Sequence, residues 1–498
     1  MNDHNIALGE GSGNQDGGRV LKTGGTALMQ KFMVLIFGWG AFLYSLDCRF
    51  AAKDVYGPPD LTANSIIVPN PMAVVVDTTF DVNCIMGSNA RNICADTTNR
   101  NIAILYGGRS DDNTVNIMKT KIAYTTNSGQ NWLRFGPYAA RYPAYRRMYG
   151  GIDARGYSWG NREVIFGAWH EAHYRRGAFV DSSPIVVAFD SATFPSGDFR
   201  PRILPHSGDP EHNIWLTGVA VRSDDPGTVI ASGCDYDVTN GETKDIFIWK
   251  STDGGYNWSD PKLLVSGTAT IGSHDAPCIR FGTGGYVFAY FQRDTLVGSD
   301  TLRWPYYIES TDNGETWIPA GGRCLFTTPP FQRYCGTWYT YDCEVVNNIP
   351  FVLNAPGVPH EHRDQMEFWK ASGVVGDRIW TRRQLHGRIP PGADTTVREV
   401  SLVTGKDYQR NGFEQNIVAV GKISGGTRTW VRPWLSRDLG NGWDFTVYFS
   451  SMPTLASPTT PFECAKTPGP FGFDFYVHMV YCETNRLLYY LGDYIRHP

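Results

Sequence analysis

Short apolar runs recur along the chain about every 60 residues. Each is a few residues long, rich in β-branched and aromatic residues, and flanked by turn-forming residues, which is the pattern of a buried strand. No amphipathic helical pattern follows residue 50, so the chain is predicted to be all-β. The runs are Ile102–Tyr106, Val164–Trp169, Val229–Ser232, Tyr286–Phe291, Phe351–Leu353, Ile417–Val420 and Phe475–Val480.

A second repeat consists of turn-forming octapeptides. Ser310–Trp317 reads Ser-x-Asp-x-Gly-x-Thr-Trp, and looser copies are Thr125–Trp132, Ser251–Trp258 and Ser436–Trp443. In such a sequence the Asp or Asn side chain binds nearby backbone N–H groups, Gly takes a positive φ and Trp packs against a neighbour. Each octapeptide is therefore predicted to be a tight turn between two strands, with Asp312 as a turn-former.

The octapeptide spacing predicts a repeating unit of about 63 residues. The copies begin at residues 125, 251, 310 and 436, so the intervals are 126, 59 and 126. Two intervals are double steps. The missing copies are expected near residues 188 and 373, where Phe189–Ala192 and Trp369–Ser372 are strand ends that run into loops. A unit of this length accommodates four antiparallel strands, as in a propeller blade.

Seven units fill residues 55–498 and predict a single domain, a seven-bladed β-propeller of four-stranded antiparallel blades. Six blades is the alternative count. Cys278–Phe281 and Val400–Val403 are examples of the first strand of a unit. The last unit, from about residue 460, lacks a fourth strand. Ser65–Val76 is predicted to supply that strand and to close the ring.

As a set, the octapeptides resemble the Asp box, or bacterial neuraminidase repeat, of the sialidase superfamily. The resemblance covers the chain from about residue 90 to about residue 450. It implies a β-propeller whose boxes lie on the outer hairpins, away from the central pocket. Because Asp boxes also occur in propellers with other roles, sialidase activity depends on the pocket and not on the boxes.

Charge and the N-terminus indicate where the protein acts. Lys and Arg number 45 against 49 Asp and Glu, so there is no basic excess for binding nucleic acid or an anionic membrane. Phe32–Leu46 is an apolar run just after Lys31. Residues 1–50 are therefore predicted to be an N-terminal tail with a signal peptide or a signal anchor, and the protein to be secreted or at the cell surface. A membrane would be contacted only through such an anchor.

The ten cysteines contain no Cys-x-x-Cys, so neither a zinc site nor a thioredoxin-type site is indicated. Cys84 with Cys94 and Cys324 with Cys335 are close enough in sequence for local disulfides in an exported protein. Buried free thiols are the alternative.

Charged and aromatic residues gather in the loops predicted to share one face of the propeller. That face collects the loop after the second strand of every blade and the loop entering the first strand. Functional sites usually lie on such loops, although exposed loops are polar in any case. The second-strand loops carry Arg109, Asp111, Asp112, His170, His173, Arg293 and Arg363, and the loop entering the fifth blade carries Trp338 and Tyr339.

The resemblance implies roles for these residues. Sialidases use an arginine cluster for the substrate carboxylate, an Asp as general acid/base and a Tyr–Glu pair as nucleophile. Arg109 with Asp111 or Asp112 lies where the family carries an Arg and an Asp. Tyr339 or Tyr341 near Glu344 is the candidate nucleophile pair.

Other substrate-binding candidates follow from loop position. They are Arg293 and Arg363 as further arginines, with His170, His173 and Trp338 beside them. The family's Arg-Ile-Pro stretch has its nearest counterpart in Arg91-Asn92-Ile93-Cys94, which has an insertion and no Pro.

Two histidine pairs bear on metal binding. His170-x-x-His173 and His360-x-His362 lie near carboxylates in predicted loops. A metal site needs three or four converging ligands, and a sequence cannot show convergence. A loop histidine is more often part of a polar surface than a metal ligand. We expect no metal and no cofactor, with Ca²⁺ on the Asp-rich loops as the alternative.

The sequence thus predicts an exported, sialidase-like propeller that recognises a carbohydrate or glycoconjugate in a central pocket. It would be an exo-glycosidase of sialidase type if it is an enzyme. The alternative is a non-catalytic surface or scaffold propeller that binds a protein or cell-wall partner. Convergence of Arg109, Asp111 or Asp112, and two further arginines in one pocket would distinguish the two.

Overall fold

The structure is a computed structural model in which all described residues lie in the compact unit Asn64–Pro498. Among them no helix is long and apolar enough to cross a membrane. The described residues are 73–79, 91–95, 101–109, 118–138, 146–155, 164–172, 174–175, 178–179, 184–190, 198–207, 214–222, 225, 227–237, 242–267, 277–297, 300–325, 341–355, 365–386, 395–405, 416–425, 428–446, 448–449, 462–464, 469–471, 474–482 and 487–496.

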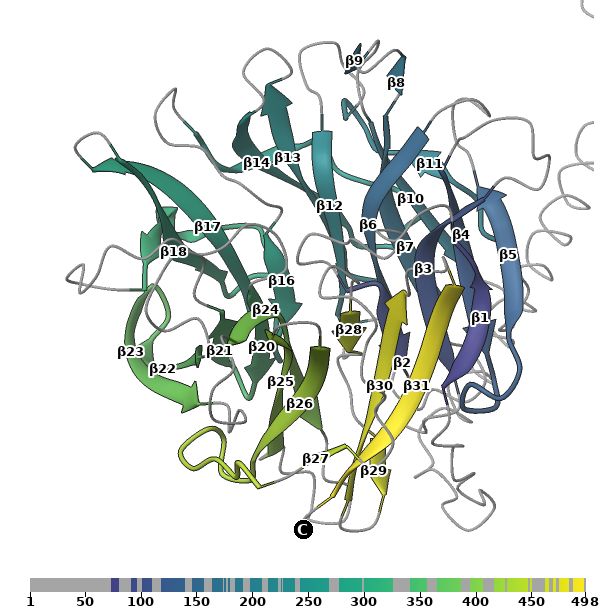
Figure 1. Ribbon diagram of the computed structural model, residues 1–498. Coiled ribbons are helices and arrows are strands. Elements are labelled where there is room, and N and C mark those ends of the chain that lie inside the picture. Colours follow the sequence, from purple (N-terminus) through teal and green to yellow (C-terminus); the bar gives the residue numbers. More distant parts are fainter. Residues whose placement is uncertain are drawn as a thin grey trace, which may run out of the picture. The chain divides into compact units, whose positions relative to one another are not determined.

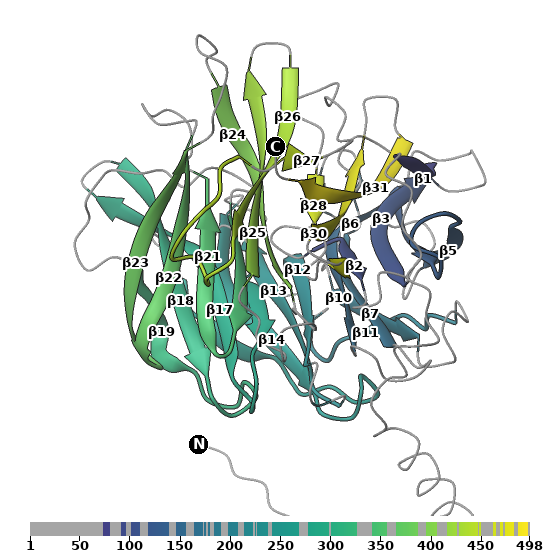
Figure 2. The same ribbon diagram turned by 90° about the horizontal axis from the view of Figure 1, so that it is seen from below.

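The described strands form seven antiparallel blades around one axis, which confirms the predicted seven-bladed propeller (Figures 1 and 2). The first strand of each blade lies innermost, and neighbouring first strands contact one another from blade 1 to blade 7. All seven predicted apolar runs are confirmed as the second strands of their blades. Figure 2 shows blade 7 returning beside blade 1, as a closed ring requires.

Each of the first four blades has four strands. Blade 1 is β2 (Ile93–Ala95), β3 (Ile102–Arg109), β4 (Met118–Thr125) and β5 (Leu133–Tyr138). Blade 2 is β6 (Arg146–Arg155), β7 (Val164–Ala172), β10 (Ile185–Asp190) and β11 (Arg202–Ile203), with a small ribbon of β8 (Tyr174–Arg175) and β9 (Ala178–Phe179). Blade 3 is β12 (Ile214–Val221), β13 (Val229–Asp237), β14 (Glu242–Ser251) and β15 (Lys262–Val265). Blade 4 is β16 (Cys278–Phe281), β17 (Val287–Val297), β18 (Asp300–Ser310) and β19 (Ile318–Cys324).

Blade 5 also has four strands, whereas blades 6 and 7 differ in how their outer edge is made. Blade 5 is β20 (Tyr341–Val346), β21 (Ile349–Asn354), β22 (Gln365–Val374) and β23 (Asp377–His386). Blade 6 is β24 (Thr395–Gly405), β25 (Asn416–Gly425) and β26 (Arg428–Ser436), with a single bridge from Leu435 to Asp444 at its edge. Blade 7 is β28 (Phe462–Cys464), β30 (Asp474–Cys482), β31 (Leu487–Arg496) and β1 (Val74–Thr78), with β27 (Tyr448–Phe449) and β29 (Gly469–Phe471) beside them.

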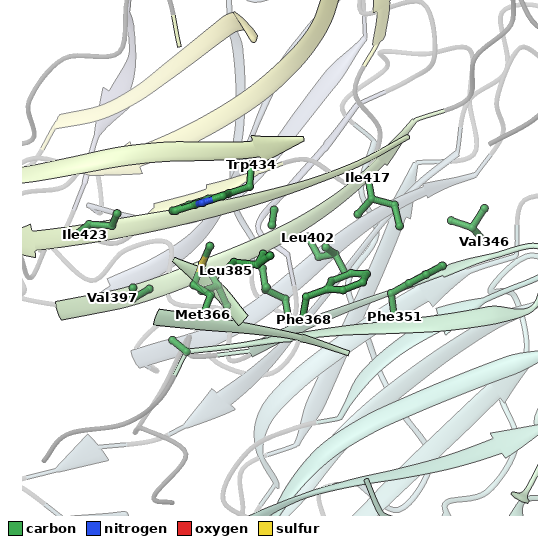
Figure 3. Packing of buried hydrophobic residues seen from close by; sticks show 14 residues of the cluster. Val346, Phe351, Met366, Phe368, Leu385, Val397, Leu402, Ile417, Ile423 and Trp434 are labelled. Atoms are coloured by element: carbon green, nitrogen blue, oxygen red, sulfur yellow. The ribbon is translucent and has the colours of Figure 1, made fainter. Parts of the chain in front are cut away.

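The core lies between the blades. The described residues form seven clusters of buried apolar side chains, one at each blade-to-blade interface. Figure 3 shows the cluster between blades 5 and 6, where Phe351, Met366 and Phe368 pack with Leu402 and Trp434. Since each blade buries both faces against its neighbours, no blade has a core of its own, and stability depends on closing the ring.

The four octapeptides share one hydrogen-bond pattern. In the copy with the full consensus, Ser310 Oγ donates to Asp312 Oδ1 (2.7 Å) and accepts from the N–H of Gly314 (2.8 Å). Asp312 Oδ1 also accepts from the N–H of Thr316 (2.8 Å). Burial raises the pKa of Asp312, but hydrogen bonds from Thr316 and Ser310 outweigh it and lower that pKa to about 2. The same three bonds recur in the other copies, so the predicted turn-forming role of Asp312 is confirmed.

The central glycine of each octapeptide also packs closely against a side chain of the preceding blade. A Cβ on Gly129 of blade 1 would lie 2.1 Å from the ring of Tyr490 in blade 7, and one on Gly440 of blade 6 would lie 2.3 Å from the ring of Phe368 in blade 5. Gly255 and Gly314 approach Phe166 and Ile230 in the same way. The octapeptides therefore join blades as well as turning the chain.

Blade 5 lacks an octapeptide and uses a charged network instead. Its β22–β23 hairpin lies near residue 373, as predicted, and the N–H of Gly376 donates to Glu309 of blade 4 (2.7 Å). Arg378 Nε binds the other oxygen of the same carboxylate (2.8 Å), and Tyr286 also donates to it. Because Glu309 is fully buried, this network holds blade 5 against blade 4 where the turn motif is missing.

The ring is closed by β1, which pairs with β31 as the outermost strand of blade 7. The prediction that an N-terminal strand completes the last blade is confirmed, although the strand is Val74–Thr78 and residues 65–72 lie outside the described part of the chain. Asp77 accepts a hydrogen bond from Tyr106 and lies 3.7 Å from Lys121, while Arg134 donates to Val76 O (2.6 Å). Blade 1 thereby fixes the closing strand.

A buried histidine in blade 7 makes stability depend on pH. His478 is fully buried with Nδ1 2.8 Å from Tyr490 Oη, and burial lowers its pKa to about 3. Below pH ~6.5 the His478 side chain binds a proton in the unfolded chain but stays neutral in the folded chain. The contribution of His478 to the free energy of unfolding is therefore complete above pH ~6.5 and is lost as the pH falls. We expect the free energy of unfolding to fall by about 2 kcal/mol between pH ~7 and ~5 because of this side chain. Urea unfolding of the wild type at both pH values measures it.

Two variants assign that loss to one side chain. His478→Gln should remove this part of the pH dependence, whereas His206→Gln, at a histidine whose side chain is 60% exposed, should keep it. An unchanged dependence in His478→Gln would show that other groups cause the acid sensitivity.

Candidate functional site

The octapeptides define one end of the blades. The N–H of Gly254 donates to Gly227 O (2.9 Å) and that of Asn313 to Gly285 O (2.8 Å). Octapeptides and first-to-second-strand hairpins therefore share an end. The second strands end, and the first strands begin, at the opposite end because the strands are antiparallel. We call this the loop end.

One predicted site residue, Arg109, is placed at the loop end by its strand. Arg109 is the last residue of β3 and pairs with Met118, so the backbone places it there. The other loop candidates Asp111, Asp112, His173, Trp338, Tyr339 and Arg363 lie outside the described residues. Their proposed roles stay predictions.

Besides Arg109, two further candidates expected in loops lie within strands. His170 is inside β7, paired with Ile185 and fully buried. Arg293 is inside β17, where it lies over the ring of Tyr306 and donates to Ser266 O (3.1 Å). The expected loop positions are wrong because β7 and β17 extend beyond their apolar runs, and the alternation of a strand continues through polar residues.

The structure brings Glu344 together with two arginines at the innermost strands. Arg91, two residues before β2, and Arg280 of β16 both approach Glu344 Oε1, at 2.7 and 3.3 Å. They also bind Asp342, at 2.7 and 3.0 Å. We call Arg91, Arg280, Asp342 and Glu344 the axial cluster, because they come from the inner strands of blades 1, 4 and 5.

Asp342 is the centre of the axial cluster. Its Oδ2 accepts from Arg91 and from the N–H of Leu402 in blade 6 (2.8 Å). Its Oδ1 accepts from Arg280 and from the N–H of Cys343 (2.8 Å). One carboxylate thus joins inner strands of blades 1, 4, 5 and 6.

Neighbouring backbone holds Arg91 in place. Arg91 O accepts from the N–H of Ile152 in β6 (2.7 Å). Asn92 Nδ2 donates to Leu105 O and to Gly150 O, each at 3.0 Å. Arg91 therefore reaches the axis from a backbone fixed by blades 1 and 2.

All four groups of the axial cluster are buried, none more than 8% exposed. Burial lowers the pKa of Arg91, but the attraction of Asp342 and Glu344 outweighs it and raises that pKa. Burial raises the pKa of Asp342, but Arg91 and Arg280 outweigh it and lower that pKa. With all four groups ionised, two positive charges balance two negative ones. Among the described residues, Glu344 Oε2 and Arg91 Nε and Nη1 have no hydrogen-bond partner.

Tyr341 does not pair with Glu344. The two residues are three apart on β20, so their side chains point to opposite faces of the strand. Tyr341 packs edge-on against Tyr290, with ring centroids 4.9 Å apart, between blades 4 and 5. The arrangement expected for a Tyr341–Glu344 nucleophile pair is therefore wrong, and Tyr339 lies outside the described residues.

Arg280 and Asp342 are absent from the candidates drawn from the sequence, and Arg91 enters only as a partial motif. A local signal exists for each. Arg280 interrupts the apolar run Cys-Ile-Arg-Phe, and Asp342 and Glu344 alternate in Tyr-Asp-Cys-Glu, which places both on one face of a strand. A buried charge within an apolar strand needs a partner, but the sequence does not show which partner.

Metal binding has no support in the part of the chain that the structure describes. No group of three or more His, Cys, Asp or Glu side chains there is arranged to hold a metal ion. His173, His360 and His362 lie outside these residues.

Comparison with known proteins gives similarity in fold. No protein-family model matches the sequence, and no curated protein does. A Penicillium chrysogenum α-L-arabinanase complexed with arabinobiose is similar, with 14% identity, 75% of this chain and 99% of that chain covered, and a TM-score of 0.44. A Hadza microbial sialidase has 13% identity, coverages of 76% and 73%, and a TM-score of 0.43. A Fusarium graminearum α-L-arabinofuranosidase complexed with arabinobiose has 11% identity, coverages of 70% and 92%, and a TM-score of 0.42.

Proposed function

We propose that the protein is an exported propeller that recognises glycans at the loop end of its axis. The observation that carries the proposal is the convergence of Arg91 and Arg280 with two carboxylates at the inner strands. Guanidinium and carboxylate groups fixed by a rigid scaffold are the groups that bind sugar hydroxyls and carboxylates in defined directions. The octapeptides, which resemble Asp boxes, support the same class of protein.

The finer proposal is exo-glycosidase activity of sialidase type. Arg91 lies in the stretch that corresponds best to the Arg-Ile-Pro of sialidases, and it reaches the axis. Arg109 ends β3 at the loop end. In this proposal Asp111 or Asp112 is the general acid/base. The proposed carbohydrate substrate is of the same class as the carbohydrates named for the similar propellers. The proposal itself rests on the residues of this chain.

A second candidate is a non-catalytic scaffold propeller that binds a protein or cell-wall partner. One observation favours it: Arg91 and Arg280 are already bound to Asp342 and Glu344. Because its charges balance one another, the axial cluster can serve to hold the inner strands together. The arginines then support the fold, and binding takes place on the loops alone.

Hydrolysis of aryl glycosides tests the finer proposal. The full chain is incubated with fluorogenic sialosides and with neutral aryl glycosides. We expect turnover of at least one, reduced at least about 100-fold in an Asp111→Ala/Asp112→Ala variant, since a general acid/base contributes about 10²–10⁴-fold. Release of the fluorophore measures it.

Asp377→Ala is the matched control because that carboxylate is exposed on the hairpin of blade 5. It should keep full activity. If no aryl glycoside is turned over above background, the glycosidase proposal fails, and binding of the inactive chain to immobilised glycans decides between glycan recognition and the scaffold role.

A further inference from the structure

Two cysteines of neighbouring blades meet beside the axial cluster. Cys278 is the first residue of β16 in blade 4, and Cys343 lies in β20 of blade 5. Their Sγ atoms are 2.9 Å apart, and Cys343 Sγ is 3.3 Å from Cys278 O. Both side chains are fully buried. A disulfide bond is about 2.05 Å long, so the sulfur atoms would need to approach by about 0.9 Å more.

We propose that Cys278 and Cys343 form a disulfide bond when the protein folds in an oxidising compartment, and that this bond clasps blade 4 to blade 5. The sequence does not suggest this pair, since the two cysteines are 65 residues apart. The local pairs Cys84–Cys94 and Cys324–Cys335 stay predictions, because Cys84 and Cys335 lie outside the described residues.

The chemistry is thiol–disulfide exchange with a disulfide-bearing oxidant such as oxidised glutathione or an oxidoreductase. One cysteine, as its thiolate, attacks the oxidant, breaks its S–S bond, forms a mixed disulfide and releases one thiol. The second cysteine then attacks the protein sulfur of that mixed disulfide and releases the second thiol. Two protein thiols lose two protons and two electrons, and the oxidant is reduced to two thiols.

Burial dictates when this reaction takes place. Both sulfur atoms are inaccessible once blades 4 and 5 have docked. Burial also raises the pKa of Cys343 well above its usual range, so its thiolate is scarce in the folded chain. The bond therefore forms as β16 and β20 come together during folding, before both sulfur atoms are covered, and the folded protein protects it from reduction.

The proposed Cys278–Cys343 disulfide lies on the same strands as three residues of the axial cluster. Cys278 is two residues before Arg280, and Cys343 lies between Asp342 and Glu344. Arg280 Nε donates to Cys343 O (3.0 Å). The bond thus links the strand that carries one arginine to the strand that carries both carboxylates, independently of any glycan binding.

Peptide mapping tests the proposal. The full chain is produced in an oxidising secretory compartment, denatured with an alkylating agent and no reductant, and digested with trypsin. Cleavage after Lys and Arg places Cys278 in residues 263–280 and Cys343 in residues 334–363. We expect a linked mass of these two peptides that separates on reduction. If both peptides carry alkylated thiols instead, the proposal is overturned.

Cys335 shares the second peptide, so the mapping is repeated with Cys335→Ser. The linked mass of the two peptides should persist in Cys335→Ser and be absent from Cys343→Ser. Loss of the linked mass in Cys335→Ser would also overturn the proposal. A disulfide that closes the 65-residue loop between Cys278 and Cys343 should raise Tm by an amount on the order of 5 °C. Wild type should show that difference between its oxidised form and a form refolded after denaturation in dithiothreitol, and Cys278→Ala should lack this part of the difference.

Discussion

Replacing Asp342 by alanine is expected to lower the free energy of unfolding by about 3–5 kcal/mol, the usual cost of removing one partner from a buried charge pair. Arg91 and Arg280 would both lose a carboxylate at 2.7 and 3.0 Å and would stay buried with Glu344 as the one carboxylate left in the axial cluster. The N–H groups of Cys343 and Leu402 would lose their acceptor as well. Urea unfolding at neutral pH measures the change.

Asp377→Ala is the control for this prediction. Asp377 pairs with Arg323, but the two side chains are 73% and 47% exposed, so its removal should cost less than about 1 kcal/mol. Equal effects of Asp342→Ala and Asp377→Ala would contradict the view that the axial cluster holds the inner strands together.

Gly129→Ala should destabilise the protein by about 3 kcal/mol, from two separate causes. Gly129 has φ of +84°, which costs a residue with a Cβ about 1–2 kcal/mol. In addition, the Cβ would lie 2.1 Å from the ring of Tyr490. That ring cannot move aside, because it packs edge-on against Trp132 and its Oη lies 2.8 Å from His478 Nδ1. The clash falls at the interface of blades 7 and 1, where the ring closes.

Gly284→Ala separates the two causes. Gly284 has φ of +64°, and a Cβ there would meet nothing within 4 Å, so only the backbone cost of about 1 kcal/mol applies. Thermal or urea unfolding of both variants gives the difference. If both are equally destabilised, the octapeptide glycines serve the turn alone and do not join the blades.

The blade count and the strand order were predictable because they depend on local, repeated signals. The apolar runs mark the second strands, and the four octapeptides mark the third-to-fourth turns. Blade 5 shows what a local signal cannot predict. Glu309 and Arg378 replace its octapeptide through side chains 69 residues apart in the sequence, and no turn motif marks either residue.

The candidate site was predictable in part. The sequence indicates Glu344, which lies in the axial cluster, but its partners Arg91 and Arg280 come from blades 1 and 4. Three inner strands must meet at the axis before these charges can pair. The pairing of Cys278 with Cys343 depends on the same convergence. Loop candidates such as Asp111 lie outside the described residues, so their roles rest on the experiments proposed above.

The sequence by itself determined the all-β class, the repeat of the blades, the turn-forming role of Asp312 and the closure of the ring by an N-terminal strand. These follow from hydrophobic periodicity and turn chemistry, which act over a few neighbouring residues. Only the tertiary structure decided which charges meet at the axis and which blade interface carries a cysteine pair. Those contacts join residues of different blades, and only the docking of the blades brings them within bonding distance.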